Sequence, residues 1–227
     1  MIRESVFFGA FLSISAYILG DVLKRKFKSP IFNPLLISSA VTIAVLALLN
    51  MNYEDYSASG KYLSFFLTPA TVCLAIPLYE QFELLKKNAA AIIIGITSGV
   101  LTSCLSVLAM ALIMKFSHDE YATFLPKSVT TPIGIGISEQ IGGYVGVTAA
   151  IIVITGILGN LIADVIFKLF RIKEPVAQGI ALGSSAHILG TAKAFELGEI
   201  QGAISSLSVV TAGILTVFAA NLFAGIF

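Results

Sequence analysis

The sequence has 227 residues, of which 57% are hydrophobic and 12% are charged. Soluble domains carry about 25% charged residues, so the composition excludes an ordinary soluble protein and indicates an integral membrane protein. The formal net charge is +1 and the charged residues are dispersed along the chain, which argues against nucleic-acid binding. We therefore expect an all-α, polytopic membrane protein.

The first 57 residues predict two membrane spans. Residues 5–23 are apolar and long enough to cross a bilayer. The basic run 24–28 is expected as a cytoplasmic loop, which places the N-terminus outside. Residues 30–49 form the second predicted span, and residues 50–60, which contain no basic residue, are expected as an outside loop. These features predict a multi-pass protein of the cell (inner, cytoplasmic) membrane, in contact with lipid.

Residues 127–143 are apolar but contain signals that interrupt a helix. Thr131 is expected as an N-cap and Pro132 as the first helical residue, because proline has no N–H that would be left unpaired there. Several glycines follow within the same stretch. A helix that begins inside a membrane presents free N–H groups and a partial positive charge, an arrangement that favours an anion.

A second interrupted stretch covers residues 62–87, where Thr68-Pro69 repeats the threonine–proline order of Thr131-Pro132 and a further proline follows. Full spans are predicted for residues 88–114, 146–169 and 204–227. Residues 115–121 are expected as a polar loop, whereas residues 178–199 are rich in small residues and too polar for a simple span.

The chain also repeats itself. Glu80-Gln81 recurs as Glu139-Gln140, and residues 90–93 recur at the same spacing as residues 149–152. We predict that two N-terminal spans are followed by repeats of a broken helix plus a span, with a fainter third copy, giving one membrane domain of roughly seven or eight membrane segments. The predicted parts are residues 1–57, 58–115, 116–173 and 174–227. The parity of the spans stays open.

The candidate substrate-binding residues share a position beside a predicted helix break. For the threonine–proline pairs, a kink stabilised by threonine hydroxyls is the purely structural alternative. Ser184 and Ser185 are expected to cap a third helix start. The candidates are Thr68, Pro69, Thr71, Ser128, Thr130, Thr131, Pro132, Ser184, Ser185, His187, Gly190 and Thr191.

Ionisable residues inside a membrane are functional candidates by default, although a hydrogen-bonded core histidine is the alternative for His187. Lys193 and Glu196 can pair on one helix face, and Asp164 lies on a predicted span. These four residues are the proton-coupling candidates. The sequence shows no nucleophile–base pair, phosphate loop or metal-ligand spacing, so we expect no catalytic residue, no metal, no cofactor and no enzyme activity.

Four stretches resemble the LrgB/CidB family: residues 67–79, 126–133, 186–199 and 202–207. The resemblance implies an antiholin-like or holin-like protein tied to murein hydrolase control, with a small LrgA/CidA-type membrane protein as partner. The family's plant relative is similar to a chloroplast glycolate/glycerate carrier, and bacterial members are linked to pyruvate.

Two functions are therefore weighed. The first is a secondary transporter of small monocarboxylates of the glycolate, glycerate, lactate or pyruvate type, with proton coupling. The alternative is an antiholin-like or holin-like regulator that forms homo-oligomers and changes membrane permeability. The glycine-rich, interrupted repeats favour the transporter, because a simple pore needs only short plain spans.

Overall fold

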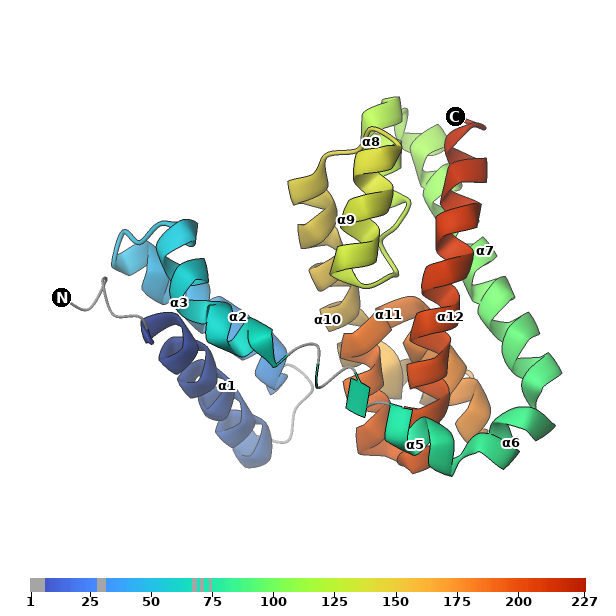
Figure 1. Ribbon diagram of the computed structural model, residues 1–227, viewed down its shortest axis with the longest axis horizontal. Coiled ribbons are helices and arrows are strands. Elements are labelled where there is room, and N and C mark those ends of the chain that lie inside the picture. The colour runs from blue at the N-terminus through green and yellow to red at the C-terminus, as the bar shows by residue number, and fades with distance from the viewer. Residues whose placement is uncertain (1–6, 28–31, 67–68, 70–71, 74) are drawn as a thin grey trace. The chain divides into compact units, whose positions relative to one another are not determined.

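The computed structural model describes residues 7–27, 32–66, 69, 72–73 and 75–227. Every regular element within these ranges is a helix, which confirms the all-α prediction. The chain divides into two compact units, residues 1–73 and residues 74–227 (Figure 1).

The first unit is built on one long helix that contacts two others. The helices bounded within its described residues are α1 (Phe8–Phe27), α2 (Pro34–Leu48) and α3 (Tyr53–Phe65). The backbone N–H of Gly9 donates to Ser59 Oγ at 2.8 Å, which joins α1 to α3. Asn33 caps α2, its side chain accepting from two backbone N–H groups of the first turn.

Two expected loops of this unit are helical over most of their described residues. Residues 53–65 form α3, because Tyr56 OH lies 2.7 Å from Ser13 Oγ and Ser59 also bonds to α1, contacts that a sequence pattern does not display. The basic run expected as a loop belongs to α1 as far as Phe27, where cations favour the negative end of the helix dipole and Arg25 pairs with Asp21 at 2.9 Å.

The second unit contains eight helices in its described residues, three of which are long and apolar enough to cross a membrane: α7, α10 and α12. The full set is α5 (Ala75–Glu80), α6 (Phe82–Lys87), α7 (Ala89–Met114), α8 (His118–Phe124), α9 (Thr131–Gln140), α10 (Val145–Leu169), α11 (Pro175–Leu197) and α12 (Glu199–Ala224). These three agree with the three full spans predicted in this part of the sequence. In the first unit α2 is apolar but shorter, so the larger number of segments and the repeat stay predictions.

The three long helices are apolar on their exposed sides as well as inside. On α7, one stripe of residues is buried at helical spacing, whereas Ile93, Ile94 and Leu112 on other sides are more than half exposed. A soluble protein rarely exposes contiguous apolar surface of this extent, but lipid covers it at no cost. The protein is therefore a membrane protein.

Helices α8, α9 and α11 pack beside different halves of the three long helices. In Figure 1, α8 and α9 lie beside one half of the long helices and α11 beside the other half. Near the start of α10, Ser138 Oγ of α9 lies 2.7 Å from Thr148 Oγ1. Further along α10, Asn160 bonds to α11 instead. This division places the start of α9 and the middle of α11 near the middle of the long helices.

The expected polar loop at residues 115–121 is also wrong in part, since α8 begins at His118. Ser117 and Glu120 form a capping box: Ser117 Oγ accepts from the N–H of Glu120, and a Glu120 carboxylate oxygen accepts from the N–H of Ser117. The Ser-x-x-Glu pattern was present in the sequence and is a sufficient signal for this helix start.

Candidate functional site

Helix α11 is interrupted at His187, whose backbone angles are φ 44° and ψ −137°. A side chain at Gly190 would collide with the carbonyl oxygen of Leu182, although these residues would lie about 12 Å apart in a straight helix. The chain therefore folds back at His187, so that residues 175–186 and 188–197 form two limbs of a hairpin. A positive φ at a residue other than glycine costs about 1–3 kcal/mol and is maintained only by strong surrounding contacts.

Those contacts come from α10. His187 is buried, and its Nε2–H donates to the carbonyl oxygen of Ile152 at 3.0 Å. Glycine at position 156 leaves room for the imidazole ring, because a Cβ there would lie 2.6 Å from Cε1 of His187. Gly159 accommodates Ala186 in the same way. The glycines that the sequence places on α10 thus form the surface on which the tip of the α11 hairpin packs.

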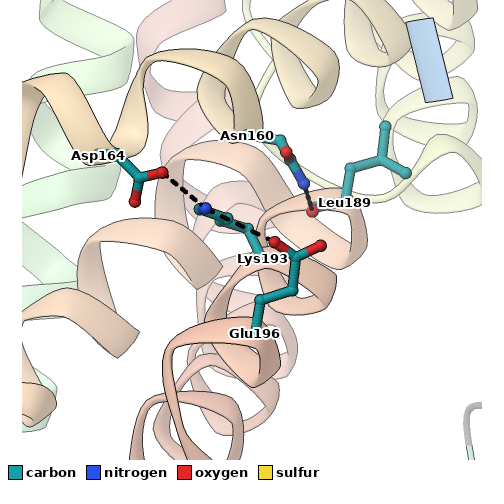
Figure 2. A network of polar contacts seen from close by, with 5 residues as sticks. All are labelled: Asn160, Asp164, Leu189, Lys193 and Glu196. Carbon is teal, nitrogen blue, oxygen red and sulfur yellow. Dashed lines mark hydrogen bonds and ion pairs between the residues drawn. The ribbon is translucent and has the colours of Figure 1, made fainter. Parts of the chain in front are cut away.

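The polar groups at this interruption are paired within the protein. Thr191 Oγ1 donates to the carbonyl oxygen of His187 at 3.1 Å and lies 2.9 Å from Ser205 Oγ of α12. Asn160 Nδ2 donates to the carbonyl oxygen of Leu189 at 2.9 Å, as Figure 2 shows. Interrupted helices are tolerated at membrane depth only when neighbouring groups satisfy the freed backbone in this manner.

The start of α9 differs by one residue from the prediction. Thr130 is the N-cap, with extended backbone angles, and Thr131 and Pro132 are in the first turn. The side chain of Thr130 makes no capping hydrogen bond. Helix α9 ends after ten residues, where Gly142 adopts φ 85° and the N–H of Gly143 donates to the Ser138 carbonyl at 2.7 Å.

The turn before α9 brings a lysine that the sequence analysis missed to the middle of α7. Lys127 Nζ donates to Ser103 Oγ at 2.8 Å and lies 3.4 Å from Ser128 Oγ, and the two hydroxyls are 3.1 Å apart. The sequence signal for a functional role of Lys127 was a basic residue between Pro126 and a serine in an apolar protein. Its depth could not be inferred, because it depends on how the turn before α9 packs against α7.

Contacts along two of the long helices place the two interruptions at the same level, which we call the meeting point. A Cβ on Gly99 of α7 would lie 2.9 Å from Ser184 Oγ, and Ser103, which contacts Ser128, is one turn further along the helix, about 6 Å away. On α10, Ile152 binds His187 through its carbonyl and touches Gly134 of α9 through its side chain. The predicted residues Ser128, Thr130, Thr131, Ser184 and His187 are therefore brought to one level of the fold.

Two predicted caps are wrong. Ser184 Oγ donates to the Ile180 carbonyl at 2.7 Å and Ser185 Oγ to the Ala181 carbonyl at 2.6 Å, so both hydroxyls bond back into the helix that precedes the interruption. Ser185 also lines a different, apolar hollow of about 210 Å³ between α10 and α11. Ser184 stays near the meeting point, whereas Ser185 faces away from it.

The remaining ionisable candidates form a separate cluster. Lys193 Nζ lies 2.8 Å from Asp164 Oδ2 and 3.6 Å from Glu196 Oε2 (Figure 2). The lysine side chain is 12% exposed, but the two carboxylates are 45% and 49% exposed. Asp164 borders a hollow of about 460 Å³ that also has Lys168, Arg171 and Lys173 on its wall. This cluster links the return limb of α11 to the later half of α10.

Of the candidates in the interrupted stretch 62–87, Thr68 and Thr71 lie outside the described residues. Pro69 is described and is exposed.

Comparisons of the sequence with known proteins identify its family. The model of the LrgB-like family matches residues 13–226. A relative from Bacillus subtilis (strain 168), the uncharacterized protein YwbG, is 41% identical over 213 residues, which is 92% of this chain and 93% of the relative. No solved structure matches the chain significantly. The match over nearly the whole chain places this membrane protein in the LrgB family.

Proposed function

We propose that this LrgB-family protein is a secondary transporter of small monocarboxylates of the glycolate, glycerate, lactate or pyruvate type. One observation carries the proposal: α11 folds back at His187, and the turn before α9 reaches the same level of α7 and α10. Two half-length elements thus reach one level among membrane-long helices. Transporters bind substrate at such interruptions, near the middle of the bilayer.

The chemistry at the start of α9 suits an anion. The N–H groups of the first turn have no intrahelical partner, and the helix dipole adds a partial positive charge there. Thr130 and Thr131 are half-buried, and the Thr130 hydroxyl makes no capping bond that would occupy these donors. A carboxylate would accept from the backbone, while the threonine hydroxyls would bind the 2-hydroxyl or keto oxygen of the acid.

A proton could accompany the substrate. His187 lies at the tip of the folded-back helix, bonded to a helix carbonyl rather than to a carboxylate. In the proposed cycle it is the first candidate to exchange a proton, and the cluster of Asp164, Lys193 and Glu196 is the second.

The deciding experiment measures uptake of radiolabelled glycolate, lactate and pyruvate into proteoliposomes that contain the purified protein, with and without a pH gradient. We expect saturable uptake that an inward proton gradient accelerates. The Thr131→Val and Pro132→Ala variants should lose most of the uptake, because they alter the start of α9. Thr102→Val is the matched control, since Thr102 is an exposed threonine of α7.

Three results would overturn the proposal: no uptake above protein-free liposomes, uptake that does not saturate, or equal uptake by the Thr131→Val and wild-type proteins. Release of an entrapped dye without selectivity would instead support the antiholin-like or holin-like regulator. In that case addition of a small LrgA/CidA-type partner should change the leakage.

A further inference from the structure

Lys127 and Lys193 are the two partly buried lysines in the described residues of the second unit, and their bonding partners differ. Lys193 has two carboxylates as partners, whereas Lys127 has the hydroxyls of Ser103 and Ser128. Among the residues that the structure describes, no carboxylate is close enough to form an ion pair with Lys127. The Lys127 side chain is partly buried beside the middle of α7, so an ammonium there is only partly hydrated.

Such a charge is costly in an apolar protein. Burying an ammonium without a counter-charge costs several kcal/mol, and ionisable groups within membrane segments persist where they bind a substrate or an ion. Serine hydroxyls satisfy part of the hydrogen-bonding capacity of Nζ, which has three donors, but they carry no negative charge. An anion bound beside Nζ would therefore stabilise the charged form of the lysine.

The surroundings define which anion fits. Lys127 precedes the N-terminal end of α9, so the partial charge of the helix adds to the single charge of the ammonium. The hydroxyls of Ser103 and Ser128 lie within hydrogen-bonding distance of each other and of Nζ, so they orient the ammonium, while Thr130 and Thr131 are left for the oxygen next to the carboxylate. One full positive charge with neighbouring hydroxyls matches a singly charged acid that carries a 2-hydroxyl or 2-oxo group.

We propose that Lys127 Nζ binds the carboxylate of the transported acid, with Ser103 and Ser128 holding the ammonium in place, and that its single charge selects monocarboxylates over dicarboxylates. This assignment rests on the proposed transport function. It places the substrate carboxylate on the α9 side of the meeting point, beside α7, rather than against the imidazole of His187.

The test compares wild-type protein with Lys127→Gln, Lys127→Arg and the control Lys86→Gln, which changes an exposed lysine at the end of α6. Two readouts are used: the half-saturating glycolate concentration for proteoliposome uptake, and protection from thermal unfolding by glycolate, by its neutral analogue glycolamide, by malonate and by chloride. We expect Lys127→Gln to raise the half-saturating concentration at least tenfold and to abolish the preference for glycolate over glycolamide. Lys127→Arg should retain that preference, and Lys86→Gln should match wild type.

If Lys127→Gln is not monodisperse after purification, the Ser103→Ala variant tests the assignment instead. This variant keeps Lys127 but removes the hydroxyl nearest to Nζ. A rise of several-fold in half-saturation supports the assignment, and wild-type values overturn it. Lys127→Gln with an unchanged preference for glycolate, or wild-type protein protected equally by chloride and glycolate, also overturns it. Absence of uptake by wild type refutes transport alone, since protection by glycolate that depends on Lys127 would still establish the anion site.

Discussion

Replacing Gly156 with alanine tests the packing on which the folded-back helix depends. The added Cβ would lie 2.6 Å from Cε1 of His187, 2.7 Å from Nε2 and 2.8 Å from Cδ1 of Leu189. Carbon atoms in normal contact are about 3.5–4.0 Å apart, so the ring would have to move by about 1 Å. The ring cannot move freely, because its Nε2–H donates to the Ile152 carbonyl at 3.0 Å.

The size of the effect follows from three contributions. Overpacking of this kind costs about 1–3 kcal/mol, and loss of the histidine bond adds about 0.5–1.5 kcal/mol. Alanine is favoured over glycine in a helix by about 1 kcal/mol, which opposes these costs. We therefore expect Gly156→Ala to lower the free energy of unfolding by about 1–3 kcal/mol. For a chain of this size, each kcal/mol lowers the midpoint of thermal unfolding by about 2–4 °C.

The assay is thermal unfolding of the purified protein in one detergent, with two comparisons. Gly146→Ala is the matched control on α10, since nothing lies within 4 Å of a Cβ at that position. The double variant Gly156→Ala/His187→Ala should be no less stable than His187→Ala alone, because removing the imidazole makes room for the methyl group. The reasoning is refuted if Gly156→Ala is as stable as Gly146→Ala, or if its cost is unchanged when His187 is alanine.

Two further substitutions test the contacts drawn in Figure 2. Asn160→Leu should lower the free energy of unfolding by about 1–3 kcal/mol, because the Leu189 carbonyl loses a donor at 2.9 Å; an unchanged thermal midpoint would contradict this role. Lys193→Gln should lower it by less than about 1 kcal/mol, since both carboxylate partners are nearly half exposed, and the difference should shrink in high salt. A loss above about 2 kcal/mol for Lys193→Gln would show that the pair is more important than its exposure suggests.

The long helices were predictable because length and hydropathy determine them. Residues 88–114 were expected as a span and α7 covers Ala89–Met114; residues 146–169 were expected and α10 covers Val145–Leu169. Helix α3 was missed because its polar residues find partners on α1, which is tertiary information. Helix α8 was missed although its capping box was visible in the sequence.

The sequence predicted where the helices of the site break, but not which groups its polar side chains would bond to. The proline at position 132 located the start of α9 to within one residue, because proline is tolerated only in the first turn. Ser184 and Ser185 were expected to cap a helix, but serine hydroxyls inside a helix can bond to the carbonyl one turn back, and these do. Ser103 and Lys127 are 24 positions apart on different elements, so no local pattern predicts that they lie side by side.

The two interruptions are not equivalent, and the difference indicates where an anion belongs. At His187 the carbonyl accepts from Thr191, and the imidazole donates to α10, so protein groups satisfy this break. At the start of α9 the Thr130 side chain makes no capping bond, and the neighbouring Lys127 is bonded to hydroxyls rather than to a carboxylate. Positive charge and free donors thus accumulate on the α9 side. In the proposed transporter, an incoming carboxylate would therefore gain most by binding on the α9 side rather than at His187.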